Sequence, residues 1–285
     1  MFAVAGVSGH TGAATAEALL KQGQKVRVLV RDAAQGEPWL RRHAEVAVVD
    51  LHDADQMAAA VKGLSGAYLL LPPVPADQDV LLVQGTMLSQ FVKALKRSTL
   101  KHLTFLSSAG AQHPAGTGPV LALHRAEKAL AGIVPSVTFL RPSYFLENWG
   151  AQLLQSLETG TLTHFGHVHP KFNQVCARDI GEAAAKVMID SVPGTRVVEV
   201  TGREPWSVED LAIAFASLLG QPIKAVELPV ESAKDALEKA GMIPSTAALY
   251  AELYHGLTRG LFQFAHAHQI VRGTTTLIDA LKPLV

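Results

Sequence analysis

The sequence predicts a doubly wound α/β fold, in which a parallel sheet is covered by helices on both faces. Two features lead to this prediction. Short apolar runs alternate with longer helical runs from residue 2 to residue 200, and such alternation is typical of βαβ units. The first apolar run also leads directly into a glycine-rich turn that opens a helix. A strand, a glycine turn and a helix therefore follow one another as a βαβ unit requires.

The first βαβ unit combines residues 2–5 as a strand, residues 13–22 as a helix and residues 25–30 as the second strand. Its turn has the pattern G-x-x-G-x-x-G, where the usual dinucleotide fingerprint is G-x-G-x-x-G. Glycines let a pyrophosphate approach the backbone, and the helix N-terminus attracts the anion. A glycine turn that binds nothing is the alternative. We expect a Rossmann-type cofactor site with contacts from Gly6, Ser8, Gly9, His10, Thr11 and Gly12.

The end of the second strand predicts the choice of cofactor. An NAD-specific protein places Asp or Glu here against the ribose 2′-hydroxyl, about 20 residues beyond the glycines. This chain has Arg31, whose guanidinium attracts a 2′-phosphate. One alternative is that the carboxylate of Asp32, the next residue, turns toward the ribose. Another is that Arg31 is an ordinary surface residue with no contact to the cofactor. We expect NADP(H) in preference to NAD(H).

Further strands and helices continue the same rhythm. Strands are expected at residues 45–49, 67–71, 103–106, 137–140, 196–200 and 223–228. Helices are expected at residues 54–62, 78–97, 179–189, 232–240 and 245–256, around residues 124–128, and from Ser207 to near Gly220.

Because the carboxyl ends of parallel strands line the ligand crevice, Asp50 and Leu51 are candidates to border an adenine. Asp50 as a turn cap is an equal alternative. Leu71 and Pro72, where two prolines stop a strand, should form a wall of the cofactor channel.

Composition narrows the class of protein. Lys and Arg together number 25, as do Asp and Glu, so no basic excess attracts nucleic acid or an anionic membrane. The single cysteine, Cys176, cannot form an internal disulfide, which fits a reducing cytoplasm. We expect its side chain to be a small buried apolar residue. The first strand begins at residue 2, which leaves no room for a leader, and no apolar stretch approaches the ~20 residues of a membrane helix. We expect a cytoplasmic protein with a small-molecule substrate.

Polar residues follow the strand at residues 103–106. Ser107 and Ser108 come at its carboxyl end, and His124 and Lys128 lie four apart on the next helix, which places them on one helix face. Such donors are able to bind a ribose and to serve a carbonyl oxygen. A histidine and a lysine on a solvated helix face are the alternative.

Several motifs together resemble the NmrA-like branch of the atypical short-chain dehydrogenase/reductase superfamily. They are the glycine turn, the strand-terminal Ser-Ser, the H-x-x-x-K helix and residues 140–148, 177–183 and 199–204, with sequences LRPSYFLEN, ARDIGEA and EVTGRE. The likeness extends from Phe2 to about Leu281. It implies a Rossmann domain at residues 1–140 plus about 174–202. A smaller C-terminal α/β substrate lobe is implied at about 141–173 plus 203–285.

The resemblance also implies an NAD(P) cofactor and a choice of activities. Members of the family include NAD(P)H-dependent quinone and azo-dye reductases, isoflavone-type reductases and regulators that bind NADP without catalysis. Ser107, Lys128 and Pro142 are then expected at the cofactor, and Lys128, His124 and Ser108 at the catalytic position. The superfamily pattern is Y-x-x-x-K, and His124 stands in the place of the tyrosine.

That departure affects which reactions are expected. Alcohol oxidation and sugar-nucleotide epimerisation need a group that removes a hydroxyl proton. A quinone is already electrophilic and takes its protons from water, so hydride delivery needs mainly proximity. We expect a reductase of a quinone or similar planar acceptor. A non-catalytic NADP(H) sensor that binds a protein partner is the main alternative, and a metal-dependent or epimerising enzyme is a remote third. The sequence leaves open whether the protein forms a homodimer.

The segment after residue 140 supplies the expected substrate contacts. Tyr144, Phe145 and Trp149 offer flat apolar surface, although ordinary core packing is the alternative. Asn148 either orients the substrate or caps a turn. Histidines at 164, 167 and 169 are expected on the surface of a loop and not at a metal.

Helix caps are expected at three further places. Asp179 should cap the helix at 179–189, Ser207 with Asp210 should form a capping box, and residues 274–276 should cap the last helix.

Overall fold

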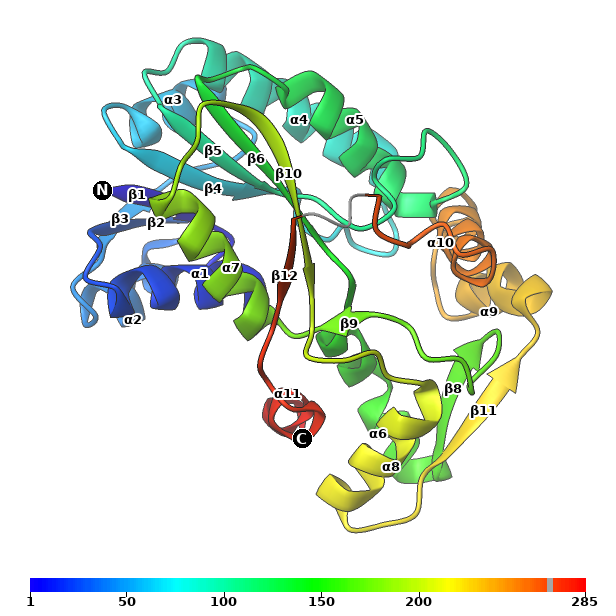
Figure 1. Cartoon of the computed structure of the whole chain (residues 1–285). Coiled ribbons are helices and arrows are strands. Elements are labelled where there is room, and N and C mark those ends of the chain that lie inside the picture. The colour runs from blue at the N-terminus through cyan, green and yellow to red at the C-terminus, as the bar shows by residue number, and fades with distance from the viewer. Residues whose placement is uncertain (266–268) are drawn as a thin grey trace.

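The computed structural model describes residues 1–265 and 269–285 and is built around one parallel sheet (Figure 1). Its strand order is β12-β10-β6-β5-β4-β1-β2-β3. The strands are β1 (Phe2–Ala5), β2 (Val26–Val30), β3 (Glu45–Val48), β4 (Gly66–Leu70), β5 (His102–Leu106), β6 (Ser136–Pro142), β10 (Gly194–Thr201) and β12 (Ile270–Arg272). The predicted doubly wound α/β fold is confirmed.

Helices cover both faces of this sheet. Figure 1 shows α1 (His10–Lys21), α2 (Ala33–Leu40) and α7 (Ala177–Ile189) on one face, and α3 (Ala54–Val61), α4 (Val80–Lys96) and α5 (Leu121–Leu130) on the other. Each face has its own apolar core. Because the inner strands β4, β5 and β6 are buried at every residue, none of them has a solvent-facing side. The polar residues within β5 and β6 are themselves buried.

The order of the strands fixes where a ligand binds. Strand β1 pairs with β2 on one side and with β4 on the other, so strand addition reverses direction at β1. In doubly wound sheets the ligand crevice lies outside the carboxyl ends of the strands at this reversal. The glycine turn after β1 and the segment after β4 therefore meet at the crevice.

Helices α1 and α7 pack closely on one another beside this crevice. A Cβ added to Gly181 would lie 2.5 Å from the Cβ of Ala14, so only a glycine allows the two helices to approach so closely.

A smaller lobe is built from the chain after β6. It contains β7 (Tyr144–Phe145), α6 (Leu153–Thr159), β8 (Thr161–Phe165), β9 (Gln174–Val175), α8 (Val208–Leu219), β11 (Lys224–Leu228) and α11 (Leu277–Leu281). Strand β8 pairs in parallel with β11, and β7 with β9. A third apolar core, which includes Trp149, Leu162 and Phe215, holds this lobe together.

Helix α10 (Pro244–Thr258) connects the lobe to the main sheet. It follows α9 (Ala233–Lys239). On the loop after β4, the Gln78 carbonyl accepts from the Thr246 hydroxyl at 2.8 Å. On the loop after β5, the Gly116 N–H donates to the Glu252 carboxylate at 2.7 Å. The ring of Tyr254, further along the helix, packs on Phe165 of β8. Helix α10 therefore contacts both parts of the protein.

Some elements differ from the prediction. Helix α2 is not predicted, because Gly36 and Pro38 both disfavour helix. Residues 270–272, which the sequence assigns to the lobe, form β12 and pair with β10 in the main sheet. Residues 161–165, in a region expected to be loop-like, form β8.

Asp179 does not cap helix α7. The N-cap position is Cys176, and Asp179 lies inside the first turn with 3% of its surface exposed. Its carboxylate accepts a hydrogen bond from the Thr275 hydroxyl at 2.8 Å. The side chain therefore ties α7 to the segment before α11. Cys176 is buried, as expected.

Two other capping predictions are confirmed. The Ser207 hydroxyl accepts from the Asp210 N–H at 3.1 Å while the Asp210 carboxylate accepts from the Ser207 N–H at 2.9 Å, a capping box for α8. Thr276 accepts from the Asp279 N–H at 3.2 Å and caps α11. Each such cap is worth about 1 kcal/mol.

Within the described parts of the chain, no helix has both the length and the apolar character that crossing a bilayer requires.

Candidate active site

The three glycines of the first turn have different surroundings. Gly6 has φ +71°, a left-handed conformation that side chains rarely adopt. A Cβ on Gly12 would lie 2.3 Å from the carbonyl oxygen of Gly6, so Gly12 lets α1 pack against β1. A Cβ on Gly9 would meet only that same oxygen, at an ordinary 3.5 Å. The fold therefore requires Gly6 and Gly12 but leaves space at Gly9.

The open side of this turn faces away from the core. Ser8, Gly9 and His10 are exposed, and helix α1 begins at His10, three residues earlier than predicted. The first N–H groups of a helix have no partner within it and point outward. Thr11 is buried, and its carbonyl accepts from the Thr15 hydroxyl at 2.8 Å. Thr11 is therefore less accessible than Ser8, Gly9 and His10.

Asp32 and Arg31 are distinguished by their contacts. The Asp32 carboxylate accepts from the Ala34 N–H at 3.0 Å and is the N-cap of α2. The Arg31 side chain is exposed directly after β2. The Asp32 carboxylate therefore already has a role in the fold, whereas the Arg31 side chain extends into solvent.

The other predicted cofactor contacts lie at neighbouring strand ends. Asp50 accepts from the His52 N–H at 2.8 Å and so caps a turn, while Leu51 packs partly into the core. Leu71 is 8% exposed, and the Pro72 carbonyl accepts from the Gln84 side chain at 2.9 Å. Leu71 and Pro72 directly follow β4, the strand beside the glycine turn.

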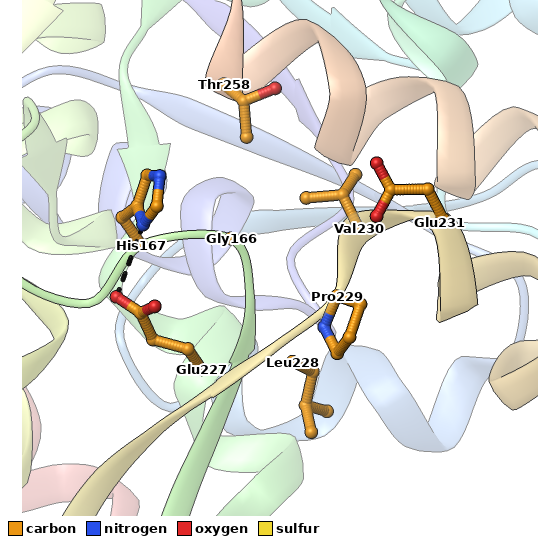
Figure 2. A pocket seen from close by; sticks show the side chains of 8 residues that line it. All are labelled: Gly166, His167, Glu227, Leu228, Pro229, Val230, Glu231 and Thr258. Atoms are coloured by element: carbon orange, nitrogen blue, oxygen red, sulfur yellow. Dashed lines mark ion pairs between the residues drawn. The ribbon is translucent and has the colours of Figure 1, made fainter.

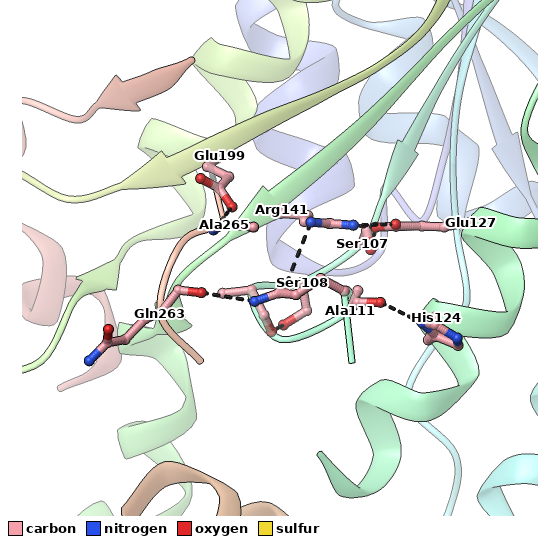
Figure 3. A network of polar contacts seen from close by, with 11 residues as sticks. Ser107, Ser108, Ala111, His124, Glu127, Arg141, Glu199, Gln263 and Ala265 are labelled. Carbon is pink, nitrogen blue, oxygen red and sulfur yellow. Dashed lines mark hydrogen bonds and ion pairs between the residues drawn. The ribbon is translucent and has the colours of Figure 1, made fainter. Parts of the chain in front are cut away.

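A buried ion pair lies at the ends of β5 and β6 (Figure 3). The Arg141 guanidinium donates to both carboxylate oxygens of Glu127, at 2.8 and 2.6 Å, and the side chains are 7% and 11% exposed. The Ser107 hydroxyl donates to the same carboxylate at 2.5 Å. The hydroxyl proton of Ser107 is thus used inside the protein, and Ser107 is 2% exposed. Neither Glu127 nor Arg141 is predicted from the sequence, although Arg141, a charged residue in an otherwise uncharged strand, is a signal for a buried pair.

The side chains expected at the catalytic position lie around the same strand end. His124 is partly buried, and its Nδ1 lies 2.8 Å from the carbonyl oxygen of Ala111 in the loop after β5. Lys128, one turn further along α5, is exposed. The Ser108 hydroxyl donates to the Ala109 carbonyl at 2.8 Å. Pro142 is buried, and its carbonyl accepts from the Ala109 N–H at 2.9 Å.

Trp149 is a core residue and not a substrate surface. It is 2% exposed, and its indole N–H donates to the Gln174 side chain at 2.8 Å. Phe145 is partly buried against the α1 and α7 core. Tyr144 is partly exposed, and Asn148 is exposed. Of the four predicted substrate contacts, Trp149 is therefore wrong, because the lobe core needs a large apolar side chain there.

Tyr144 belongs to a row of partly exposed aromatic rings, which we call the aromatic wall: Tyr144, Phe172, His164 and Tyr254. Successive ring centroids are 5.8, 6.3 and 6.2 Å apart. Burial lowers the pKa of His164 to about 4 and raises the pKa values of Tyr144 and Tyr254. The wall is therefore uncharged at neutral pH and suits a neutral planar ligand.

His164 thus differs from the prediction of a loop surface, because it lies on β8 and its ring is half-buried in this wall. His167 and His169 are exposed, and each lies beside a carboxylate: Glu227 at 3.4 Å and Glu209 at 2.9 Å. Glu209 raises the pKa of His169. Among the described residues, no group of three or more His, Cys, Asp or Glu side chains is arranged to hold a metal ion.

A cavity of about 440 Å³ lies beyond the far end of the wall (Figure 2). It is lined by Gly166, His167, Glu227, Leu228, Pro229, Val230, Glu231 and Thr258. A Cβ on Gly166 would lie 3.8 Å from His164 Nε2, so the cavity adjoins the wall. No residue of the glycine turn lines it.

The fold and the glycine turn together define a Rossmann-type nucleotide-binding protein. The NmrA-like family model matches residues 1–257, and the chain belongs to this family. The NAD(P)H azoreductase of Xenophilus azovorans is 26% identical over 256 residues, covering 89% of this chain and 86% of the relative. Quinone oxidoreductase 2 of Escherichia coli is 24% identical over 292 residues, which cover 100% of this chain and 98% of the relative. Among solved structures, the NADPH-dependent quinone oxidoreductase of Escherichia coli in complex with NADPH is similar in fold, with a TM-score of 0.82 and 22% sequence identity. The match covers 100% of this chain and 99% of that chain.

Proposed function

We propose that this protein is an NADP(H)-dependent reductase that transfers hydride to a quinone or similar planar electrophilic acceptor. The observation that carries the proposal is the open space at Gly9, in a turn whose other glycines are fixed by the fold. A residue that has room for a side chain, but lacks one beside exposed helix N–H groups, is suited to a pyrophosphate. Two relatives in the family are named as NAD(P)H-dependent or quinone oxidoreductases, which supports an oxidoreductase.

The residues present fit the cofactor. The turn from Gly6 to Gly12 would hold the pyrophosphate, and the exposed Arg31 guanidinium would pair with a 2′-phosphate. Lys128 would reach the ribose from α5, and Pro142 would lie at the nicotinamide. When bound, the cofactor supplies the hydride. The solved relative with NADPH agrees with the expected choice of cofactor.

The aromatic wall supports a planar, neutral acceptor. Its rings are partly exposed and come from β7, β8, α10 and the loop before β9. Stacking on such rings positions a flat ligand without any charge. Positioning supplies most of what hydride transfer to a quinone needs, because the reduced oxygens take protons from water.

The alternative is an NADP(H) sensor that binds a protein partner without turnover. The observation that favours it is His124, which stands where the superfamily has its catalytic tyrosine. The two functions are separated by measuring NADPH consumption with a panel of quinones and azo dyes. The reductase predicts consumption well above the control that contains acceptor without protein. Tight NADPH binding with no consumption above that control for any acceptor would favour the sensor.

A further inference from the structure

The contact of His124 fixes which ring nitrogen carries a proton. Nδ1 lies 2.8 Å from the carbonyl oxygen of Ala111, and a carbonyl oxygen accepts but never donates. Nδ1 therefore carries a hydrogen in every protonation state of the ring. In the neutral imidazole, Nε2 must then hold the lone pair and act as a hydrogen-bond acceptor.

The Ala111 carbonyl is held in place by contacts that do not involve His124 (Figure 3). Ala111 is 1% exposed, and its N–H donates to the Ser108 carbonyl at 3.1 Å. The next residue, Gln112, donates to the Gln263 carbonyl at 2.9 Å and lies 3.5 Å from the Arg141 guanidinium. The orientation of the imidazole is therefore set before any ligand binds.

Nε2 lies on the opposite side of the ring from this anchor. Among residues 1–265 and 269–285, no side chain or backbone group hydrogen-bonds it, and it is not among the buried polar atoms without a partner. His124 is only partly buried. One turn along the same helix, Glu127 reaches Ser107 at the carboxyl end of β5. Nε2 is thus an oriented acceptor on α5, the helix whose Glu127 reaches the carboxyl end of β5.

We propose that His124 Nε2 is the acid/base of this site, and that the protein therefore also interconverts unactivated carbonyls and alcohols. This inference rests on the proposed reductase function. In reduction, the Nε2 proton of the imidazolium passes to the carbonyl oxygen while hydride from the bound cofactor adds to the carbonyl carbon. In oxidation, the hydroxyl proton passes to Nε2 while hydride leaves that carbon for the oxidised cofactor. Nδ1–H keeps its bond to Ala111 in both states, so the ring transfers the proton without turning.

The tautomer is tested without turnover by nitrogen-15 NMR of labelled protein, with the His124 signals assigned by their loss in His124→Gln. The expected result in the neutral ring is a protonated Nδ1 and an unprotonated Nε2. A neutral ring that carries its proton on Nε2 overturns the proposal.

The chemistry is tested by comparing kcat/KM for an aliphatic aldehyde with kcat/KM for a neutral quinone, each with NADPH. In His124→Ala the ratio of the two should fall about a hundredfold or more, the usual loss of general acid catalysis. Added imidazole should restore at least about a tenth of the lost ratio, which a purely structural role would not allow. His169→Gln, which changes an exposed histidine of the lobe, should leave the ratio unchanged.

Two outcomes of this comparison contradict the proposal at different levels. A wild type that reduces the quinone but not the aldehyde overturns the role of His124 and leaves the proposed function in place. Turnover of neither acceptor overturns the proposed reductase, and the acid/base step with it.

Discussion

Gly6, Gly9 and Gly12 lie in one turn, but their surroundings assign them separate roles. Gly9→Val should leave the free energy of unfolding nearly unchanged, because its Cβ meets only one atom, at 3.5 Å. The same change should abolish NADPH binding by calorimetry, because the side chain occupies the space of the phosphates. Undiminished NADPH affinity in a folded Gly9→Val protein would refute the assignment.

Gly12→Ala is the matched control within the same turn. Its Cβ would lie 2.3 Å from a backbone oxygen, so the stability should fall by about 1 to 3 kcal/mol, as in an overpacked core. Chemical denaturation of the two variants thus separates the glycine that the fold needs from the glycine that the ligand needs.

Arg31 is the residue that we propose to favour NADPH over NADH. Loss of one charge-assisted contact costs about 1.5 to 3 kcal/mol, or roughly ten- to a hundredfold in affinity. Arg31→Ala should therefore weaken NADPH binding by this factor and change NADH binding little. Asp32→Ala is the control: it removes the α2 cap and should lower stability by about 1 kcal/mol without changing the preference for NADPH. Equal losses for both cofactors in Arg31→Ala would show that another group reads the ribose.

At the scale of elements, the Glu127–Arg141 pair joins α5 to β6. Both side chains are nearly buried, so Arg141→Met leaves an uncompensated charge and should cost about 3 to 5 kcal/mol in denaturant unfolding. Adding Glu127→Leu should recover most of that loss, because no buried charge then remains. Arg97→Met, at an exposed pair with Asp55, should cost less than about 1 kcal/mol. A double variant no more stable than Arg141→Met would show that the pair acts through something other than charge.

Elements with a strong local pattern are the ones that the sequence predicts well. The six strands from β1 to β6 and the capping box of α8 are found because periodicity and cap chemistry are local. Helix α2 is missed because Gly36 and Pro38 disfavour it, while packing of Trp39 against the core stabilises it. Strands β8 and β12 are short and exist through pairing with distant strands, which a local pattern does not encode.

At the scale of the whole molecule, the site depends on residues far apart in the sequence. Tyr144, Phe172 and His164 contact one another within the lobe. Tyr254 joins them because α10 lies across the lobe and the loops of the main sheet. The glycine turn is continuous in sequence, so a local pattern is enough to find it. The aromatic wall is assembled from three elements and a loop, so only Tyr144 is predicted. Trp149 is misassigned for the same reason, since burial in the lobe core is a tertiary property.

The central claim is that this fold delivers hydride from NADPH to a planar acceptor. The most direct test is a single-turnover experiment without oxygen, in which protein loaded with one equivalent of NADPH is mixed with a neutral quinone and the reduced nicotinamide is followed by absorbance. We expect a rapid first-order loss of NADPH in the wild type and only the rate of the protein-free mixture in Gly9→Val. A wild type that binds NADPH yet loses it no faster than the protein-free mixture would contradict the account.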